Sequence, residues 1–286
     1  MNSPHPTVSD LHQTLARYDR EIVGEKFHTG RYELRYFSWG TGEPVLLVHG
    51  MCDTTRSFAM LMMALVDRGY RVIGYELANG KDDDANLGNY RHEDFVHDLV
   101  ALLDHLNLSE TNIMGSSFGS TVTLRALAMF PNRFRNGVVQ GGFPRRPLIR
   151  IERGLARIGR YWPWRMEDLT IRNTVMAKLE QQQFVGCPNE VFQFLIECSG
   201  LTPIRAASLR GLMIDTLDLR PLLPKIRTPL LMIGGDRDAL VPKYLEEEVI
   251  AGVPSAKRIE FQPCGHYPQY TMPAPMAEAM DTFFQE

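Results

Sequence analysis

Cysteine is scarce in this chain and follows no pattern that a metal site or a disulfide framework would need. The 286 residues contain four cysteines, Cys52, Cys187, Cys198 and Cys264, with no Cys-x-x-Cys pair among them. A small secreted protein held together by disulfides carries far more cysteine for its length. We therefore expect buried or idle thiols and no cysteine-based metal site.

The chain also lacks long hydrophobic runs, a leader pattern and a strong charge of one sign. No run approaches the length of a transmembrane span, and residues 1–6 lead into a polar segment without the basic and apolar regions of a signal peptide. The cytoplasm is therefore the expected compartment. The net charge is −3 with neutral histidines, so the overall charge gives no indication of nucleic-acid binding. Nothing in the sequence indicates the oligomeric state.

Short apolar runs alternate with helical patterns along most of the chain. Residues 44–48 form an uninterrupted apolar run, which is typical of a strand buried on both faces of a parallel sheet. Further strand-like runs occur at 71–76, 111–114, 137–140, 228–233 and 258–261. Strands that alternate with helices predict an α/β fold with a mostly parallel central sheet flanked by helices.

The alternation stops between residues 144 and 226, where the pattern is helical and no strand is evident. The sequence therefore predicts three parts. They are an N-terminal helical extension at 1–24, an α/β core formed by 25–143 and 227–286, and a helical insertion at 144–226.

A Gly-x-Ser-x-Gly sequence, from Gly115 to Gly119, joins a strand-like run to a helix-forming run. This context is typical of a nucleophile elbow, in which a serine sits on a strained turn and the flanking glycines let strand and helix approach closely. The helix that follows would direct its positive end at a developing negative charge. Ser117 is therefore the candidate nucleophile, and the alternative is a turn of small residues without chemistry.

A serine nucleophile needs an imidazole that takes its proton and a carboxylate that orients the imidazole. His266 directly follows the last strand-like run, and Asp238 directly follows the run before it. The order Ser117, Asp238, His266 is expected when all three stand at the carboxyl edge of such a sheet. Asp236 is the competing acid, and we expect it instead to cap its loop or to pair with Arg237.

Four short motifs in this order resemble those of the α/β-hydrolase fold family. They are His49-Gly50 with Phe58 eight residues after the glycine, the elbow around Ser117, Gly235-x-x-Asp238 followed by Val241-Pro242, and Gly265-His266 with Pro268 and Pro273. The resemblance covers most of residues 25–286 apart from the insertion, which in this family forms a cap over the substrate pocket. It implies that the backbone amides of Met51 and Phe118 form the oxyanion hole, and that His49 supports the loop bearing these donors.

These residues predict a serine esterase, a hydrolase that cleaves a carboxylic ester or thioester of a small molecule through an acyl-enzyme, with no metal and no organic cofactor. Carbon–carbon bond hydrolysis and acyl transfer to an acceptor other than water use the same residues. A ligand-binding protein that keeps the fold without catalysis is a further alternative.

The first part of the insertion is rich in arginine and in large apolar residues. Leu148, Ile151, Leu155 and Ile158 recur at helical spacing with arginines between them, which predicts a basic amphipathic helix. The simpler interpretation is that the apolar stripe packs on the core and leaves the arginines in water.

Two sharper interpretations of this basic helix stay open. The cap could recognise an acidic or lipid-like substrate, in which case Trp162, Trp164 and His49 are candidates for the substrate pocket. The helix could also rest on anionic lipid as a peripheral membrane contact, or dock on a partner.

Overall fold

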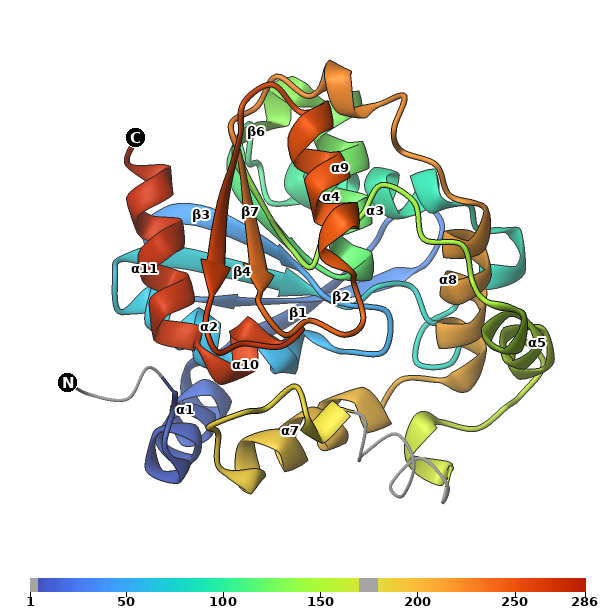
Figure 1. Cartoon of the computed structure of the whole chain (residues 1–286), viewed down its shortest axis with the longest axis horizontal. Helices are drawn as coiled ribbons and strands as arrows, with labels where there is room; N and C mark the ends of the chain where they lie inside the picture. The colour runs from blue at the N-terminus through green and yellow to red at the C-terminus, as the bar shows by residue number, and fades with distance from the viewer. Residues whose placement is uncertain (1–4, 170–179) are drawn as a thin grey trace.

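A single sheet of eight strands forms the centre of the molecule (Figure 1). The computed structural model describes residues 5–169 and 180–286. The strand order is β1-β2-β4-β3-β5-β6-β7-β8; β2 pairs antiparallel with β1 and with β4, and all other neighbours are parallel. The strands are β1 (Val23–His28), β2 (Glu33–Trp39), β3 (Glu43–Val48), β4 (Tyr70–Tyr75), β5 (Thr111–Ser116), β6 (Phe134–Gln140), β7 (Leu230–Gly235) and β8 (Ala256–Phe261).

Helices cover both faces of this sheet, which explains why residues 45–48 of β3 are all apolar and buried. In β3, Val45 and Leu47 belong to one buried cluster, whereas Leu46 and Val48 belong to the other. The first cluster includes residues of α1 (Val8–Glu21), α2 (Ala59–Val66) and α11 (Pro273–Phe284). The second includes residues of α3 (His92–His105), α4 (Phe118–Met129) and α9 (Lys243–Gly252). The predicted α/β fold with a mostly parallel sheet flanked by helices is confirmed.

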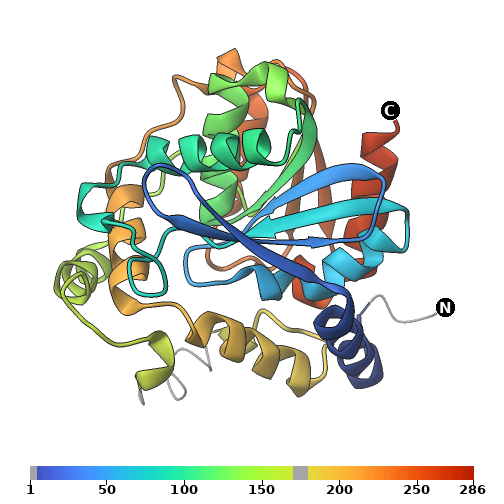
Figure 2. The ribbon, with the colours of Figure 1, turned by 180° about the vertical axis from the view of Figure 1, so that it is seen from behind.

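Between β6 and β7 the chain leaves the sheet and forms helices, which we call the cap. These are α5 (Arg150–Gly159), α7 (Asn189–Gly200) and α8 (Ile204–Thr216). No β-strand occurs in the described residues of 144–226, and residues 170–179 of the predicted insertion lie outside them. Figures 1 and 2 show α5 at the outer edge of the molecule, with α8 between it and the sheet. The remaining short helices are η1 (Thr55–Phe58), η2 (Leu87–Asn89), η3 (Pro131–Arg133), η4 (Met166–Asp168), η6 (Leu223–Lys225) and α10 (Pro268–Thr271).

The cap overturns the simpler interpretation of the basic amphipathic helix. The apolar side chains of Ile151, Leu155 and Ile158 on α5 are 72%, 65% and 62% exposed, and only Leu148, just before the helix, is buried. The helix therefore turns its apolar stripe to solvent and not to the core. The reason is that α5 packs on α8 through another face, which includes the buried Gly159.

In residues 5–169 and 180–286, no helix is both long and apolar enough to span a lipid bilayer.

Candidate active site

The predicted elbow lies at the junction of β5 and α4, and its backbone is strained. Ser117 has φ 52° and ψ −114°, a left-handed backbone that a residue with a side chain adopts at a cost of about 1–3 kcal/mol. Both flanking glycines are required, because a Cβ on Gly115 would collide with the carbonyl of Gly119, and a Cβ on Gly119 with the carbonyl of Val48. Helix α4 begins at Phe118, so its positive end lies directly beside Ser117.

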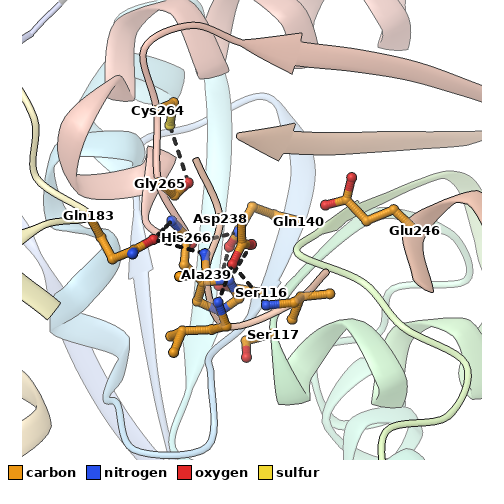
Figure 3. A network of polar contacts seen from close by, with 12 residues as sticks. Ser116, Ser117, Gln140, Gln183, Asp238, Ala239, Glu246, Cys264, Gly265 and His266 are labelled. Atoms are coloured by element: carbon orange, nitrogen blue, oxygen red, sulfur yellow. Dashed lines mark hydrogen bonds and ion pairs between the residues drawn. The ribbon is translucent and has the colours of Figure 1, made fainter. Parts of the chain in front are cut away.

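Asp238 and His266 meet at the same edge of the sheet, after β7 and β8 (Figure 3). The Nδ1 atom of His266 lies 2.6 Å from the Oδ2 atom of Asp238, and both side chains are buried. Burial alone would raise the pKa of Asp238, but the His266 ring and the hydrogen bonds from the Val241 and Leu240 amides hold that pKa below its ordinary value. Asp238 is therefore a carboxylate that orients the imidazole through Nδ1.

The competing acid, Asp236, does not reach the imidazole. Its Oδ1 atom accepts a hydrogen bond of 2.8 Å from the amide of Cys264, and its Oδ2 atom lies 3.8 Å from Nε of Arg237. Asp236 thus ties the loop after β7 to the loop that carries His266, as expected for a residue that caps its loop.

Gln140, the last residue of β6, connects the elbow to the histidine loop, and sequence reasoning missed it. Its backbone carbonyl accepts a hydrogen bond from the amide of Ser117 at 2.9 Å, and its side-chain Nε2 donates to the carbonyl of His266 at 2.7 Å. The next residue, Gly141, lies against the imidazole, since a Cβ there would stand 2.6 Å from Cε1 of His266. The signal in the sequence was a polar residue at the carboxyl end of an apolar strand.

Gln183 is a second residue that sequence reasoning missed. It precedes α7 and is buried, and its Oε1 atom accepts hydrogen bonds from the amides of His266 at 3.1 Å and Ala239 at 3.3 Å (Figure 3). One side chain from outside the α/β core therefore holds together the loops that carry the imidazole and the acid.

The loop expected to bear an oxyanion donor is held by His49. The amide of Leu77 donates to Nε2 of His49 at 3.1 Å, so Nδ1 carries the hydrogen and donates to the carbonyl of Gly50 at 2.8 Å. Burial, reinforced by the charge of the nearby Arg210, lowers the pKa of His49 to about 3. His49 is therefore neutral and braces the loop.

The two amides expected to form the oxyanion hole, those of Met51 and Phe118, make no hydrogen bond with any other described residue. The loop of Met51 also approaches the elbow, because a Cβ on Gly50 would stand 3.7 Å from Cβ of Ser117. The hydroxyl of Ser117 makes no hydrogen bond with His266 among the residues that the structure describes.

An arginine of the cap forms hydrogen bonds with the same loop. Arg210 of α8 is only 2% exposed, and it donates to the carbonyls of Met51 at 2.7 Å and of Leu77 and Ala78 at 3.0 Å each. A charged-donor hydrogen bond is stronger than a neutral one, and three of them fix the loop after β3 to the loop after β4. Sequence reasoning missed this residue as well.

The remaining pocket candidates are not brought to the triad. Trp162 and Trp164 are 38% and 51% exposed and contact each other edge to face, with ring centroids 5.4 Å apart. Neither makes a hydrogen bond or ring contact with Ser117, Asp238 or His266 in the described part of the chain.

A cavity of about 640 Å³ lies between the cap and the loops after β3 and β4. Its lining includes His49, Glu76 and Arg210, but not the triad residues. Within residues 5–169 and 180–286, no three His, Cys, Asp or Glu side chains are grouped closely enough to hold a metal ion together.

The comparisons with known proteins agree with this architecture. The AB hydrolase superfamily protein YisY of Bacillus subtilis is 23% identical over 245 residues, which cover 79% of this chain and 86% of YisY. The 2-hydroxymuconate semialdehyde hydrolase of Pseudomonas putida is 23% identical over 282 residues, or 92% of this chain and 95% of that protein. The crystal structure of the enol-lactonase from Burkholderia xenovorans LB400 superposes with a TM-score of 0.77 at 19% identity, covering 92% of this chain and all of that one.

A likeness at this level of identity to a solved structure shows a shared fold and does not transfer a substrate. A family assignment needs a match to the family itself. The family model described as alpha/beta hydrolase fold matches residues 43–194, just over half of the chain. The chain therefore belongs to the α/β-hydrolase fold family.

Proposed function

We propose that the protein is a serine hydrolase that cleaves a carboxylic ester or thioester of a small molecule. The observation that carries the proposal is the 2.6 Å contact between His266 Nδ1 and the Asp238 carboxylate, at the sheet edge where the strained Ser117 directly precedes α4. An imidazole held through Nδ1 keeps Nε2 available to accept a proton, which is the state that a general base requires.

In the proposed reaction, the Ser117 oxygen attacks the acyl carbon while His266 Nε2 takes the hydroxyl proton. The negative oxygen of the tetrahedral intermediate accepts hydrogen bonds from the amides of Met51 and Phe118. His266 then gives the proton to the leaving alcohol or thiol, and the acyl group stays on Ser117. A water molecule, deprotonated by His266, attacks this acyl-enzyme and releases the carboxylic acid and the serine.

The relatives support a hydrolase and leave two chemistries to be tested. The enol-lactonase named above is, by its name, a hydrolase of a cyclic ester, so ester cleavage is the first chemistry to test on this fold. The 2-hydroxymuconate semialdehyde hydrolase favours the second candidate, cleavage of a carbon–carbon bond, for this chain. Acyl transfer and ligand binding without turnover use the same pocket.

The decisive experiment compares two neighbouring serines. The substitution Ser117→Ala is expected to abolish labelling by a fluorophosphonate probe and to lower the rate on p-nitrophenyl esters by roughly 10⁴-fold or more. The matched control is Ser116→Ala, because the Ser116 hydroxyl is committed to Oε1 of Gln140 at 2.5 Å and is not the proposed nucleophile. This control is expected to remain labelled, with the probe on Ser117 in the labelled peptide.

Undiminished labelling of Ser117→Ala would reject the proposal. The substrate class follows from p-nitrophenyl esters of graded acyl length measured beside acyl-CoA thioesters and vinylogous diketones, with Ser117→Ala as the blank. Cleavage of only the diketones would favour the carbon–carbon hydrolase, and stoichiometric labelling without turnover of any of them would favour a binding protein.

A further inference from the structure

The outer face of α5 carries exposed apolar side chains that no element of residues 5–169 or 180–286 covers. Ile151, Leu155 and Ile158 lie within a narrow sector of the helix, since each residue advances about 100° around the axis. Ile149 and Tyr161, at the two ends of the helix, are 64% and 77% exposed. A run of large apolar side chains this exposed is uncommon on a monomeric protein and typically marks an interaction site.

The fold does not require these residues to be apolar. Helix α5 is held to α8 by its other face, where Gly159 comes so close to Ser208 that a Cβ would collide with its hydroxyl. On the same side, Arg153 forms a two-point ion pair with Asp215 of α8, at 2.6 and 2.7 Å. Packing therefore explains the small residue and the ion pair, and it leaves the aliphatic stripe unexplained.

The charge beside the stripe is strongly positive. Residues 145–160 contain six arginines and one glutamate, in a chain whose net charge is −3. Arg150 and Arg157 flank one side of the stripe and are exposed, and neither forms an ion pair with a carboxylate in residues 5–169 or 180–286. Long arginine stems can lie along an apolar surface while the guanidinium reaches a polar one.

Exposed aromatic residues follow the helix directly along the chain. Trp162 and Trp164 are both exposed, and the guanidinium of Arg160 lies 5.0 Å from the centre of the Tyr161 ring. Tryptophan and tyrosine favour the boundary between lipid headgroups and acyl chains, since one end of the ring system is apolar and the other polar.

We propose that the outer face of α5, together with Tyr161, Trp162 and Trp164, docks the protein on an anionic lipid bilayer. The exposed aliphatic stripe enters the headgroup boundary, and Arg150 and Arg157 contact lipid phosphates. The position of α5 at the outer edge of the molecule lets a flat surface reach it (Figures 1 and 2). This inference does not depend on the proposed catalysis.

Intrinsic tryptophan fluorescence of the full chain provides a direct test. Of the three tryptophans, Trp39 is buried at 3% exposure, so a change in emission reports on Trp162 and Trp164. Vesicles of phosphatidylcholine mixed with phosphatidylglycerol are expected to shift the emission to the blue and to float the protein in a density gradient. Vesicles of phosphatidylcholine alone are expected to bind far less.

Three variants separate the apolar and the electrostatic contributions. Ile151→Ser/Leu155→Ser/Ile158→Ser is expected to lower partitioning into the mixed vesicles about tenfold or more. Arg150→Gln/Arg157→Gln is expected to lower it about 30-fold at low salt, and added salt should remove most of that difference. The control Val23→Ser/Tyr244→Ser changes apolar residues of 55% and 60% exposure outside the cap, and it should bind like the wild type.

Several results would overturn the proposal. One is a wild-type protein that fails to float with the mixed vesicles at low salt. Another is a triple serine variant that floats as well as the wild type. A third is a wild-type dimer that the triple serine variant makes monomeric, with vesicle binding by neither, because the face would then be a contact between two copies of this chain.

Discussion

Two helices of the cap reverse the usual distribution of polar and apolar side chains. Helix α8 buries an arginine completely, whereas α5, which packs on it, exposes three large aliphatic residues. Arginine is rarely buried without partners, and a stripe of isoleucine and leucine is rarely left in water. The explanation differs for the two helices. Arg210 has three backbone carbonyls as partners inside the protein, and the stripe of α5 has none that the structure describes.

The comparison indicates that the inner and the outer side of the cap have different roles. The inner side, on α8, fixes the loop on which the proposed oxyanion donor Met51 stands, so its effects should appear in stability and in the rate of reaction. The outer side, the exposed aliphatic stripe of α5, faces solvent, so its effects should appear only where the protein meets another surface. Four variants, from the inner contact to the outer face, test this division.

The largest effect is expected for Arg210→Met. The substitution leaves the buried carbonyls of Met51, Leu77 and Ala78 without a donor, which should lower the free energy of unfolding by about 3–5 kcal/mol. Urea denaturation measures this loss. The matched control is Arg205→Met, because Arg205 lies on the same helix but is exposed, and its substitution should change stability by about 0.5 kcal/mol or less.

The kinetic consequence of the same contact needs a variant that stays folded. Arg210→Lys keeps a buried cation but cannot reach all three carbonyls, so kcat on a soluble ester should fall by about 10²-fold through misplacement of the oxyanion loop, with KM changed little. Equal kcat for Arg210→Lys and wild type would show that α8 supports the fold but does not position the site.

Much of the fold and of the candidate site was predictable because it depends on local pattern. Residues 44–48 were predicted to form a buried strand, because strands of a sheet that is covered on both faces are typically continuous apolar runs. The elbow was equally predictable from Gly115 and Gly119, because only glycine lets strand and helix approach this closely. The resemblance to the α/β-hydrolase fold family favoured Asp238 over Asp236 as the acid, and the structure brings Asp238 to the imidazole.

The supporting residues could not be predicted, for a physical reason. Gln140, Gln183 and Arg210 act through hydrogen bonds to backbone groups, which every residue carries, at partners 126, 83 and 159 positions away in the sequence. No pattern of residue types distinguishes Arg210 from the exposed Arg205 of the same helix. The interpretation that the apolar stripe of α5 packs on the core was wrong for a different reason. Periodicity predicts a helix and its apolar face, but it does not say which surface covers that face.

A smaller effect is expected where the two helices meet, at Asp215. Hydrogen bonds from Arg153, and one from the amide of Leu148, hold the pKa of Asp215 below its ordinary value of 3.8. A carboxylate whose pKa is lower in the folded state stabilises the fold above its unfolded pKa, and this contribution disappears as the pH falls through the folded pKa. Asp215→Asn should therefore be less stable than wild type at neutral pH, by a small fraction of the Arg210→Met loss, and the difference should shrink as the pH falls below 3.8 and through the lowered folded pKa. Urea denaturation of both proteins across this range measures the convergence, and a difference that persists at low pH would assign the effect to packing.

The smallest effect is expected for the outer face itself, when catalysis and stability are measured in the absence of lipid. Ile151→Ser/Leu155→Ser/Ile158→Ser should change the free energy of unfolding by about 0.5 kcal/mol or less per site, because side chains that are 62–72% exposed bury little apolar area on folding. The rate on a short, soluble ester should match the wild type within about twofold, since the three substituted side chains point to solvent and make no hydrogen bond with the site in the described part of the chain. A loss of several kcal/mol would show that the stripe is covered in solution by another part of the chain or by a second copy, and the division between inner and outer side would fail. An unchanged fold with weakened vesicle binding would instead assign the stripe to the bilayer alone.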